Sequence, residues 1–137
     1  MISVLVVTHD GFGNGIKKTV EAILGPQEQF DIKEFDETQS VESFSEEIES
    51  IINAMYTDLG MMIFVDLLGA TPANVTASLL SKDLVKHKKL SIITGVNIPT
   101  LFESLLGRES EDDLSLLTEN AISKGKEGIL NMVDLLR

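Results

Sequence analysis

The sequence predicts an α/β protein with a doubly wound, mainly parallel sheet of about four strands and helices on both faces. Three observations predict this class. Short aliphatic runs alternate along the chain with longer segments that carry apolar residues at helical spacing. The first and third runs are almost continuously apolar, which is typical of parallel strands covered on both faces. Both of those runs end abruptly at a polar side chain. Such alternation favours right-handed crossovers between parallel strands.

Length and composition limit the classes of function. The chain has 137 residues, a formal net charge of -11 and no cysteine. This length predicts one domain, residues 1–137, with a single sizeable core. The acidic charge makes nucleic acid and anionic membrane surfaces poor partners, and the lack of cysteine excludes thiolate chemistry. The sequence shows neither a leader nor an apolar run of ~20 residues, so we expect a cytoplasmic protein that meets a membrane only indirectly.

The first part of the chain predicts two strand-helix units. The run Ile2–Val7 predicts a central strand, followed by a helix that begins at residue 14 or 15 and ends at Leu24. Phe30–Phe35 alternates only at its start, which is typical of a shorter, half-buried strand near an edge. A helix capped by Ser40 or a neighbour is expected to reach about Met55.

The second part repeats this pattern. Met61–Val65 predicts the third strand, and Thr71-Pro72 predicts a helix start with threonine as the cap and proline at the first helical position. Leu90–Ile93 predicts a fourth strand, after which a loop leads to a helix that ends at Gly107. Residues 108–113 are expected to form an exposed connection.

The last segment, residues 114–137, is expected to be helical. Gly125 and Gly128 weaken its middle, so the sequence predicts a break or a change of state there.

Two chemically useful side chains stand where the first and third strands end. These are His9 and Asp66. Because parallel strands end at one edge of a sheet, we expect the two to meet. A carboxylate bonded to one ring N–H fixes the tautomer of a histidine and stabilises the positive charge that develops when the other nitrogen attacks. The helices that start near Gly15 and at Pro72 are expected to direct free backbone N–H groups to the same region, with the Thr71 hydroxyl as a further donor to a phosphoryl group.

Simpler interpretations of these residues remain open. His9 or Asp66 alone is compatible with a loop cap. The glycines at positions 11, 13 and 15 lack the spacing of a dinucleotide fingerprint and predict a flexible turn. His87 lies in a basic segment without a carboxylate or a second histidine, so we expect it at the surface and expect no metal site.

With these residues in view, the chain resembles the enzyme IIA proteins of the mannose family of the sugar phosphotransferase system. The markers are Thr8-His9, the segment 64–66 followed by 69–74, and the segment 94–101. The resemblance implies that His9 accepts a phosphoryl group from the phosphocarrier protein HPr on its Nε2 while Asp66 holds Nδ1. It implies transfer onward to a histidine of enzyme IIB, and only later to the sugar.

The resemblance also implies supporting residues and partners. Thr8, Gly69 and Thr71 are expected to support the phosphoryl site, with no cofactor and no metal. A homodimer is implied, with enzyme IIB and the membrane components on separate proteins. Asp10, Gly11 and Leu67 depart from residues found in some members, and we expect these positions to tune the partner surface.

Two other classes remain open from the residues alone. In a receiver domain, Asp66 would be phosphorylated beside Asp10. That class needs a lysine at the end of a later strand, where this chain has Thr94-Gly95, and it gives His9 no role. A ligand-binding module of flavodoxin-like type would use His9 to contact a phosphate.

Overall fold

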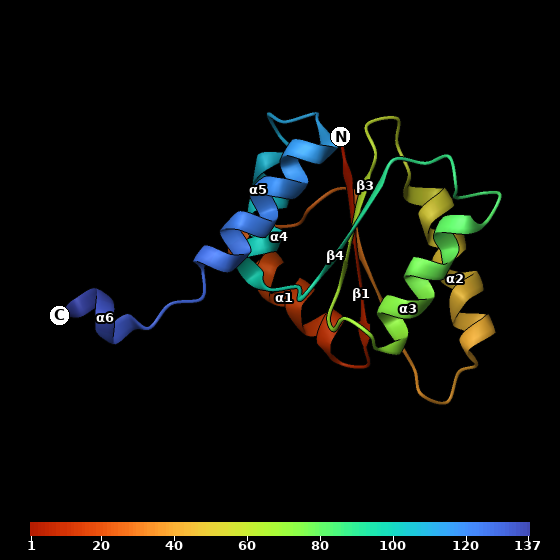
Figure 1. Cartoon of the computed structure of the whole chain (residues 1–137), viewed down its shortest axis with the longest axis horizontal. Helices are drawn as coiled ribbons and strands as arrows, with labels where there is room; N and C mark the ends of the chain where they lie inside the picture. The colour runs from red at the N-terminus through yellow and green to blue at the C-terminus, as the bar shows by residue number, and fades with distance from the viewer.

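The sheet has four strands, all parallel, in the order β2-β1-β3-β4. A computed structural model describes residues 1–137 and is shown in Figure 1. The strands are β1 (Ser3–His9), β2 (Phe30–Phe35), β3 (Met61–Val65) and β4 (Leu90–Thr94). The predicted fold class is therefore confirmed, including the edge position of β2. The two strands that end at the candidate residues, β1 and β3, are neighbours at the centre of the sheet.

Helices cover both faces of the sheet (Figure 1). One face carries α1, α4 and α5 and the other carries α2 and α3, as the core contacts also show. Their bounds are α1 (Phe12–Leu24), α2 (Val41–Met55), α3 (Thr71–Ser78), α4 (Ile98–Gly107) and α5 (Leu114–Glu127), with a 3-10 turn, η1 (Leu79–Ser81), after α3.

The central strands belong to two cores at once. In β1, Val4 and Val6 face the core under α1, α4 and α5, whereas Leu5 and Val7 face the core under α2 and α3. All four side chains are fully buried. Because neighbouring strand residues point to opposite faces and both faces are covered, all four of these positions are apolar. This explains the unbroken aliphatic run and gives the end of β1 a rigid support.

The start of α1 differs from the prediction. The helix begins at Phe12 rather than at residue 14 or 15, and only Gly11, with a φ of 88°, serves as the turn. The expected flexible glycine turn is wrong, because Gly13 and Gly15 are already helical. The reason is tertiary: a hydroxyl and a carboxylate from the strand ends accept the first free N–H groups of the helix.

The other predicted caps have mixed outcomes. Ser40 caps α2 as expected and accepts from the backbone N–H of Ser43 at 3.0 Å. Thr71 is not the cap of α3. That position belongs to Ala70, with Thr71 as the first helical residue, and no side chain caps this helix.

Arg108 contradicts the expected exposed connection at residues 108–113. It is 2 % exposed and its guanidinium donates to the backbone carbonyls of Ile2, Gln29 and Glu28. Burial lowers the pKa of Arg108, although Glu109 and Glu28 act in the opposite direction. The side chain joins the starts of β1 and β2 to the end of α4, and sequence position gives no signal of this because all three acceptors are backbone groups.

The predicted break in the last segment is confirmed. The helix α5 stops at Glu127, and a short helix, α6 (Met132–Leu136), follows. Gly125 lies inside α5, where its lack of a Cβ lets the helix approach the side chain of Thr100. Figure 1 shows α6 standing away from the body of the molecule, and residues 129–137 are exposed throughout. We call residues 129–137 the C-terminal arm.

Candidate active site

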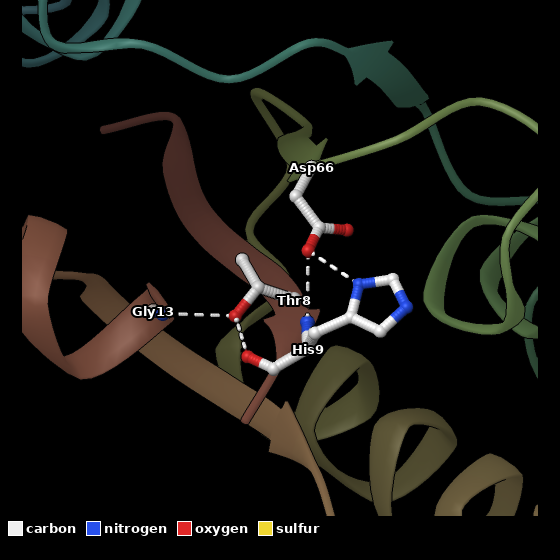
Figure 2. A network of polar contacts seen from close by, with 4 residues as sticks. All are labelled: Thr8, His9, Gly13 and Asp66. Carbon is white, nitrogen blue, oxygen red and sulfur yellow. Dashed lines mark hydrogen bonds and ion pairs between the residues drawn. The ribbon is translucent and has the colours of Figure 1, made fainter. Parts of the chain in front are cut away.

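The sheet brings His9 and Asp66 together at its carboxyl edge, as their strand-end positions predict. The Nδ1 atom of His9 lies 2.7 Å from Oδ2 of Asp66, and the backbone N–H of His9 donates to the same oxygen at 2.9 Å. Figure 2 shows both contacts. An ionised carboxylate can only accept, so the ring contact requires a proton on Nδ1. A neutral His9 therefore has its lone pair on Nε2, which faces away from Asp66 in Figure 2.

The two side chains differ in exposure, and the difference suits their chemistry. The side chain of His9 is 44 % exposed and that of Asp66 is 9 % exposed. A protein partner can reach the imidazole, whereas the carboxylate is shielded. The second oxygen of Asp66, Oδ1, is buried without a hydrogen-bond partner. The hydrogen bonds that this carboxylate accepts within the protein therefore both come from His9.

Thr8 holds the backbone carbonyl of His9, whereas Asp66 holds its backbone N–H and its ring. The Thr8 hydroxyl donates to the carbonyl of His9 at 2.7 Å and accepts from the backbone N–H of Gly13 at 2.8 Å (Figure 2). The side chain is fully buried. Thr8 thus ties the residue that carries the imidazole to the first turn of α1.

The two helix starts at this edge are not equivalent. In α1 the N–H of Gly13 is held by Thr8, and the N–H of Asn14 donates to the carboxylate of Glu34 at 2.8 Å. The first two N–H groups of α3 are those of Thr71 and Ala73, since Pro72 between them has none, and neither has an acceptor in the protein. The expectation that both helices offer free N–H groups is therefore met at Thr71 and Ala73 of α3, whereas in the first turn of α1 only the N–H of Phe12 has no acceptor.

The loop before α3 is shaped by Gly69. Its φ of 86° lies in the left-handed region, and its carbonyl accepts from the side-chain amide of Asn74 at 3.0 Å. This turn brings Thr71, which is half-buried and whose hydroxyl has no hydrogen-bond partner in the protein, to the start of the helix. The backbone conformation of this loop thus places Gly69 and Thr71 next to the N-terminus of α3, where two N–H groups have no acceptor.

The surroundings of His9 include exposed apolar side chains. Phe12 is 46 % exposed, and Leu67 and Leu68 in the loop after β3 are 60 % and 78 % exposed. An open groove runs between the first turn of α1 and the start of α4, with Phe12 and Ile98 in its lining. Asp10 is exposed and has no hydrogen-bond or ion-pair partner in the protein. His87 is exposed, as predicted, on the segment before β4.

Sequence reasoning did not identify Gly13, Asn14 and Glu34 as parts of this edge. Glu34 lies opposite Thr8 in the register of β1 and β2, a pairing that only the fold establishes. The position of Glu34 near the end of the second strand is the one sequence feature that could have placed it at this edge of the sheet. No group of three or more His, Cys, Asp or Glu side chains is arranged to hold a metal ion. No helix is long and apolar enough to cross a membrane.

The fold and the site together define a class: an α/β domain that presents a histidine, oriented by a carboxylate, at the carboxyl edge of a parallel sheet. Residues 3–122 match the family described as the fructose IIA component of the phosphotransferase system, named EIIA-man. The chain belongs to this family, which confirms the resemblance found in the sequence.

Individual relatives agree with this assignment. The chain is 29 % identical over 128 residues to the mannose-specific EIIAB component of Escherichia coli (strain K12), covering 93 % of this chain and 38 % of that protein. It is 27 % identical over 109 residues to the fructose-specific EIIA component of Bacillus subtilis (strain 168), covering 80 % and 72 %. The crystal structure of an EIIA component from Streptococcus agalactiae superposes with a TM-score of 0.88 at 27 % identity, covering 98 % and 99 %. The chain therefore spans less than half the length of the Escherichia coli relative.

Proposed function

We propose that this protein is a phosphocarrier of the sugar phosphotransferase system, with residues 1–137 acting as a single cytoplasmic domain. In this proposal His9 accepts a phosphoryl group from phospho-HPr and passes it to a histidine of enzyme IIB. The observation that carries the proposal is the contact of 2.7 Å between Nδ1 of His9 and the carboxylate of Asp66, with Nε2 on the far side of an imidazole that is 44 % exposed.

The transfer follows from this geometry. The Nε2 lone pair of neutral His9 attacks the phosphorus, and the bond between phosphorus and the nitrogen of the donor breaks, with the electron pair returning to the donor. The Nδ1 proton stays between the ring and Asp66, so the phosphorylated ring carries a positive charge that the carboxylate stabilises. Transfer to enzyme IIB repeats these steps with His9 as the leaving group.

The open start of α3 supports the phosphoryl group in this mechanism. The N–H groups of Thr71 and Ala73 and the hydroxyl of Thr71 are donors without protein acceptors, and phosphoryl oxygens accept from such groups. Gly69 provides the turn that leaves them open. Thr8 holds the backbone of His9 so that Nε2 keeps its position during both transfers.

The homodimer is part of the same proposal, and the C-terminal arm supports it. Six large apolar side chains of the arm are between 48 % and 79 % exposed: Ile129, Leu130, Met132, Val133, Leu135 and Leu136. Such a concentration of exposed apolar surface is costly in water unless another surface covers it. A second copy of the chain satisfies this need. Replacing Leu135 and Leu136 with aspartate is expected to convert a dimer into a monomer in analytical ultracentrifugation.

Mass spectrometry of the intact protein tests the phosphocarrier function. The protein is incubated with phosphoenolpyruvate, enzyme I and HPr, and wild type is compared with His9→Ala. We expect one acid-labile phosphoryl adduct in wild type and none in the variant. Labelling of the variant would move the acceptor to another residue, such as Asp66, and the absence of labelling in a folded wild-type protein would contradict the function.

The alternative of a receiver or flavodoxin-like module is not favoured. A receiver scheme leaves His9 without a role and requires a lysine where β4 ends at Thr94. The family match over residues 3–122 supports the phosphotransferase assignment instead.

A further inference from the structure

Glu34 is an acidic residue close to the site that the proposed mechanism does not use. It stands on β2 opposite Thr8 of β1. One carboxylate oxygen accepts from the backbone N–H of Asn14 at 2.8 Å, and the other accepts from the side-chain amide of the same residue at 2.8 Å. The first turn of α1 is therefore held by an edge strand that carries no other part of the site.

The packing at Gly13 shows how close this attachment is. A Cβ atom at Gly13 would lie 2.9 Å from Oγ1 of Thr8 and 3.3 Å from Cγ of Glu34. The first turn thus rests directly on the two side chains that face each other across β1 and β2. A carboxylate at a helix N-terminus is also favoured by the helix dipole, so the attachment is electrostatic as well as steric.

The attached turn offers an exposed surface next to His9 in the chain. It follows His9 by three residues, it carries the exposed ring of Phe12, and it lines one side of the groove that ends at α4. The imidazole itself is held separately by Asp66 on β3. A protein donor is large enough to contact the turn while its phosphoryl group lies at Nε2, whereas a small donor contacts only the imidazole.

We propose that Glu34 is a positioning residue that fixes the first turn of α1 as a docking surface for phospho-HPr. The inference rests on the proposed phosphocarrier function. Glu34 sets how well the protein donor binds, and Asp66 sets how fast the bound phosphoryl group is transferred. Loss of the Glu34 carboxylate frees two donors on Asn14 and lets the turn move, so the docking surface is no longer preformed.

The experiment compares two phosphoryl donors on the same variants. Glu34→Ala and Asn14→Ala are assayed with phospho-HPr and with phosphoramidate, a donor too small to need a docking surface. We expect Glu34→Ala to lower kcat/KM for phospho-HPr about tenfold, mainly through KM, and to leave the rate with phosphoramidate within about twofold. Asn14→Ala keeps the backbone N–H and is expected to have a smaller effect of the same kind.

Two control variants make the result specific. Glu34→Gln keeps one acceptor oxygen for Asn14 and is expected to recover part of the lost kcat/KM. Glu37→Ala removes an exposed carboxylate from the loop after β2 and is expected to behave as wild type. Circular dichroism tests whether each variant is folded. If Glu34→Ala does not fold, the kinetics of Glu34→Gln and of Asn14→Ala with the two donors test the docking role instead.

The outcomes separate the inference from the function on which it rests. An equal loss with both donors would place Glu34 in the chemistry of His9 and overturn the docking role. Unchanged kinetics with phospho-HPr would overturn it too. A wild-type protein that neither donor phosphorylates would instead contradict the phosphocarrier function.

Discussion

The starts of α1 and α3 lie at the same edge of the sheet, follow neighbouring strands and are built differently. In α1 Thr8 and Glu34 accept from the N–H groups of Gly13 and Asn14, which leaves only that of Phe12 open. In α3 the N–H groups of Thr71 and Ala73 both have no protein acceptor. A helix N-terminus attracts an anion only where its N–H groups are unpaired. The comparison supports the proposed division of roles, in which α1 serves support and docking and α3 binds the phosphoryl group.

The largest expected effect comes from Asp66, which stands between β3 and the loop to α3. In Asp66→Asn the ring loses its anionic partner, so the phosphorylated imidazolium is less stable and the tautomer is no longer fixed. We expect the rate of phosphoryl acceptance from phospho-HPr to fall by about 100-fold. Rapid-quench kinetics measure the rate. Asp58→Asn, which alters an exposed carboxylate in the loop before β3 at the opposite edge of the sheet, serves as the control and is expected to stay within about twofold.

The support role of α1 predicts a difference between two of its glycines. Gly13→Ala places a methyl group against Thr8 and is expected to lower the free energy of unfolding by about 1–3 kcal/mol. Gly15→Ala meets no atom within 4 Å and is expected to raise it by about 0.5–1 kcal/mol, because alanine favours a helix. Urea denaturation measures both values. Equal effects of the two substitutions would contradict the close packing at Gly13.

The phosphoryl role of α3 predicts the opposite pattern. Thr71→Val removes a hydroxyl that has no partner in the unphosphorylated protein, so stability is expected to stay within about 0.5 kcal/mol. The transfer rate is expected to fall about threefold, and Thr71→Ser is expected to restore it. Parallel measurement of denaturation and transfer distinguishes the two helix starts. A lower free energy of unfolding without a change in the phosphoryl-transfer rate would show that Thr71 has a structural role only.

The smallest expected effect concerns β2, which holds α1 through Glu34 and α2 through an ion pair of Lys33 with Glu47. The bond from Lys33 holds the pKa of Glu47 below its ordinary value of 4.5. A lowered carboxyl pKa adds stability above pH 4.5 that is lost as the pH falls through the folded pKa. Lys33→Met is expected to flatten this acid limb in thermal melts and to leave phosphoryl transfer at neutral pH unchanged. A changed transfer rate would link this ion pair to the site.

The sequence predicted the architecture well because its signals are local and repeated. Buried parallel strands require continuous apolar runs, and amphipathic helices require apolar residues at helical spacing. His9 and Asp66 were found together because each ends such a run. The first turn of α1 and the cap of α3 were misplaced, because the acceptors for α1 come from β1 and β2 and no side chain caps α3.

The C-terminal arm and Arg108 show the same contrast between features that local sequence predicts and features that depend on distant segments. The two glycines near the end of α5 predicted the break, since glycine weakens a helix wherever the helix lies. Nothing local indicated that Arg108 is buried, because its partners are carbonyls of residues at the other end of the chain.

The sequence by itself determined the strand-helix order, the buried runs and the two residues that end the central strands, because hydrophobic periodicity and abrupt polar ends are properties of adjacent residues. Only the tertiary structure decided that Glu34 meets Asn14, that Thr8 meets Gly13, and that the N–H groups of Thr71 and Ala73 in α3 stay open. Those outcomes depend on which side chains the register of parallel strands brings to a helix start, and register is a relation between distant segments.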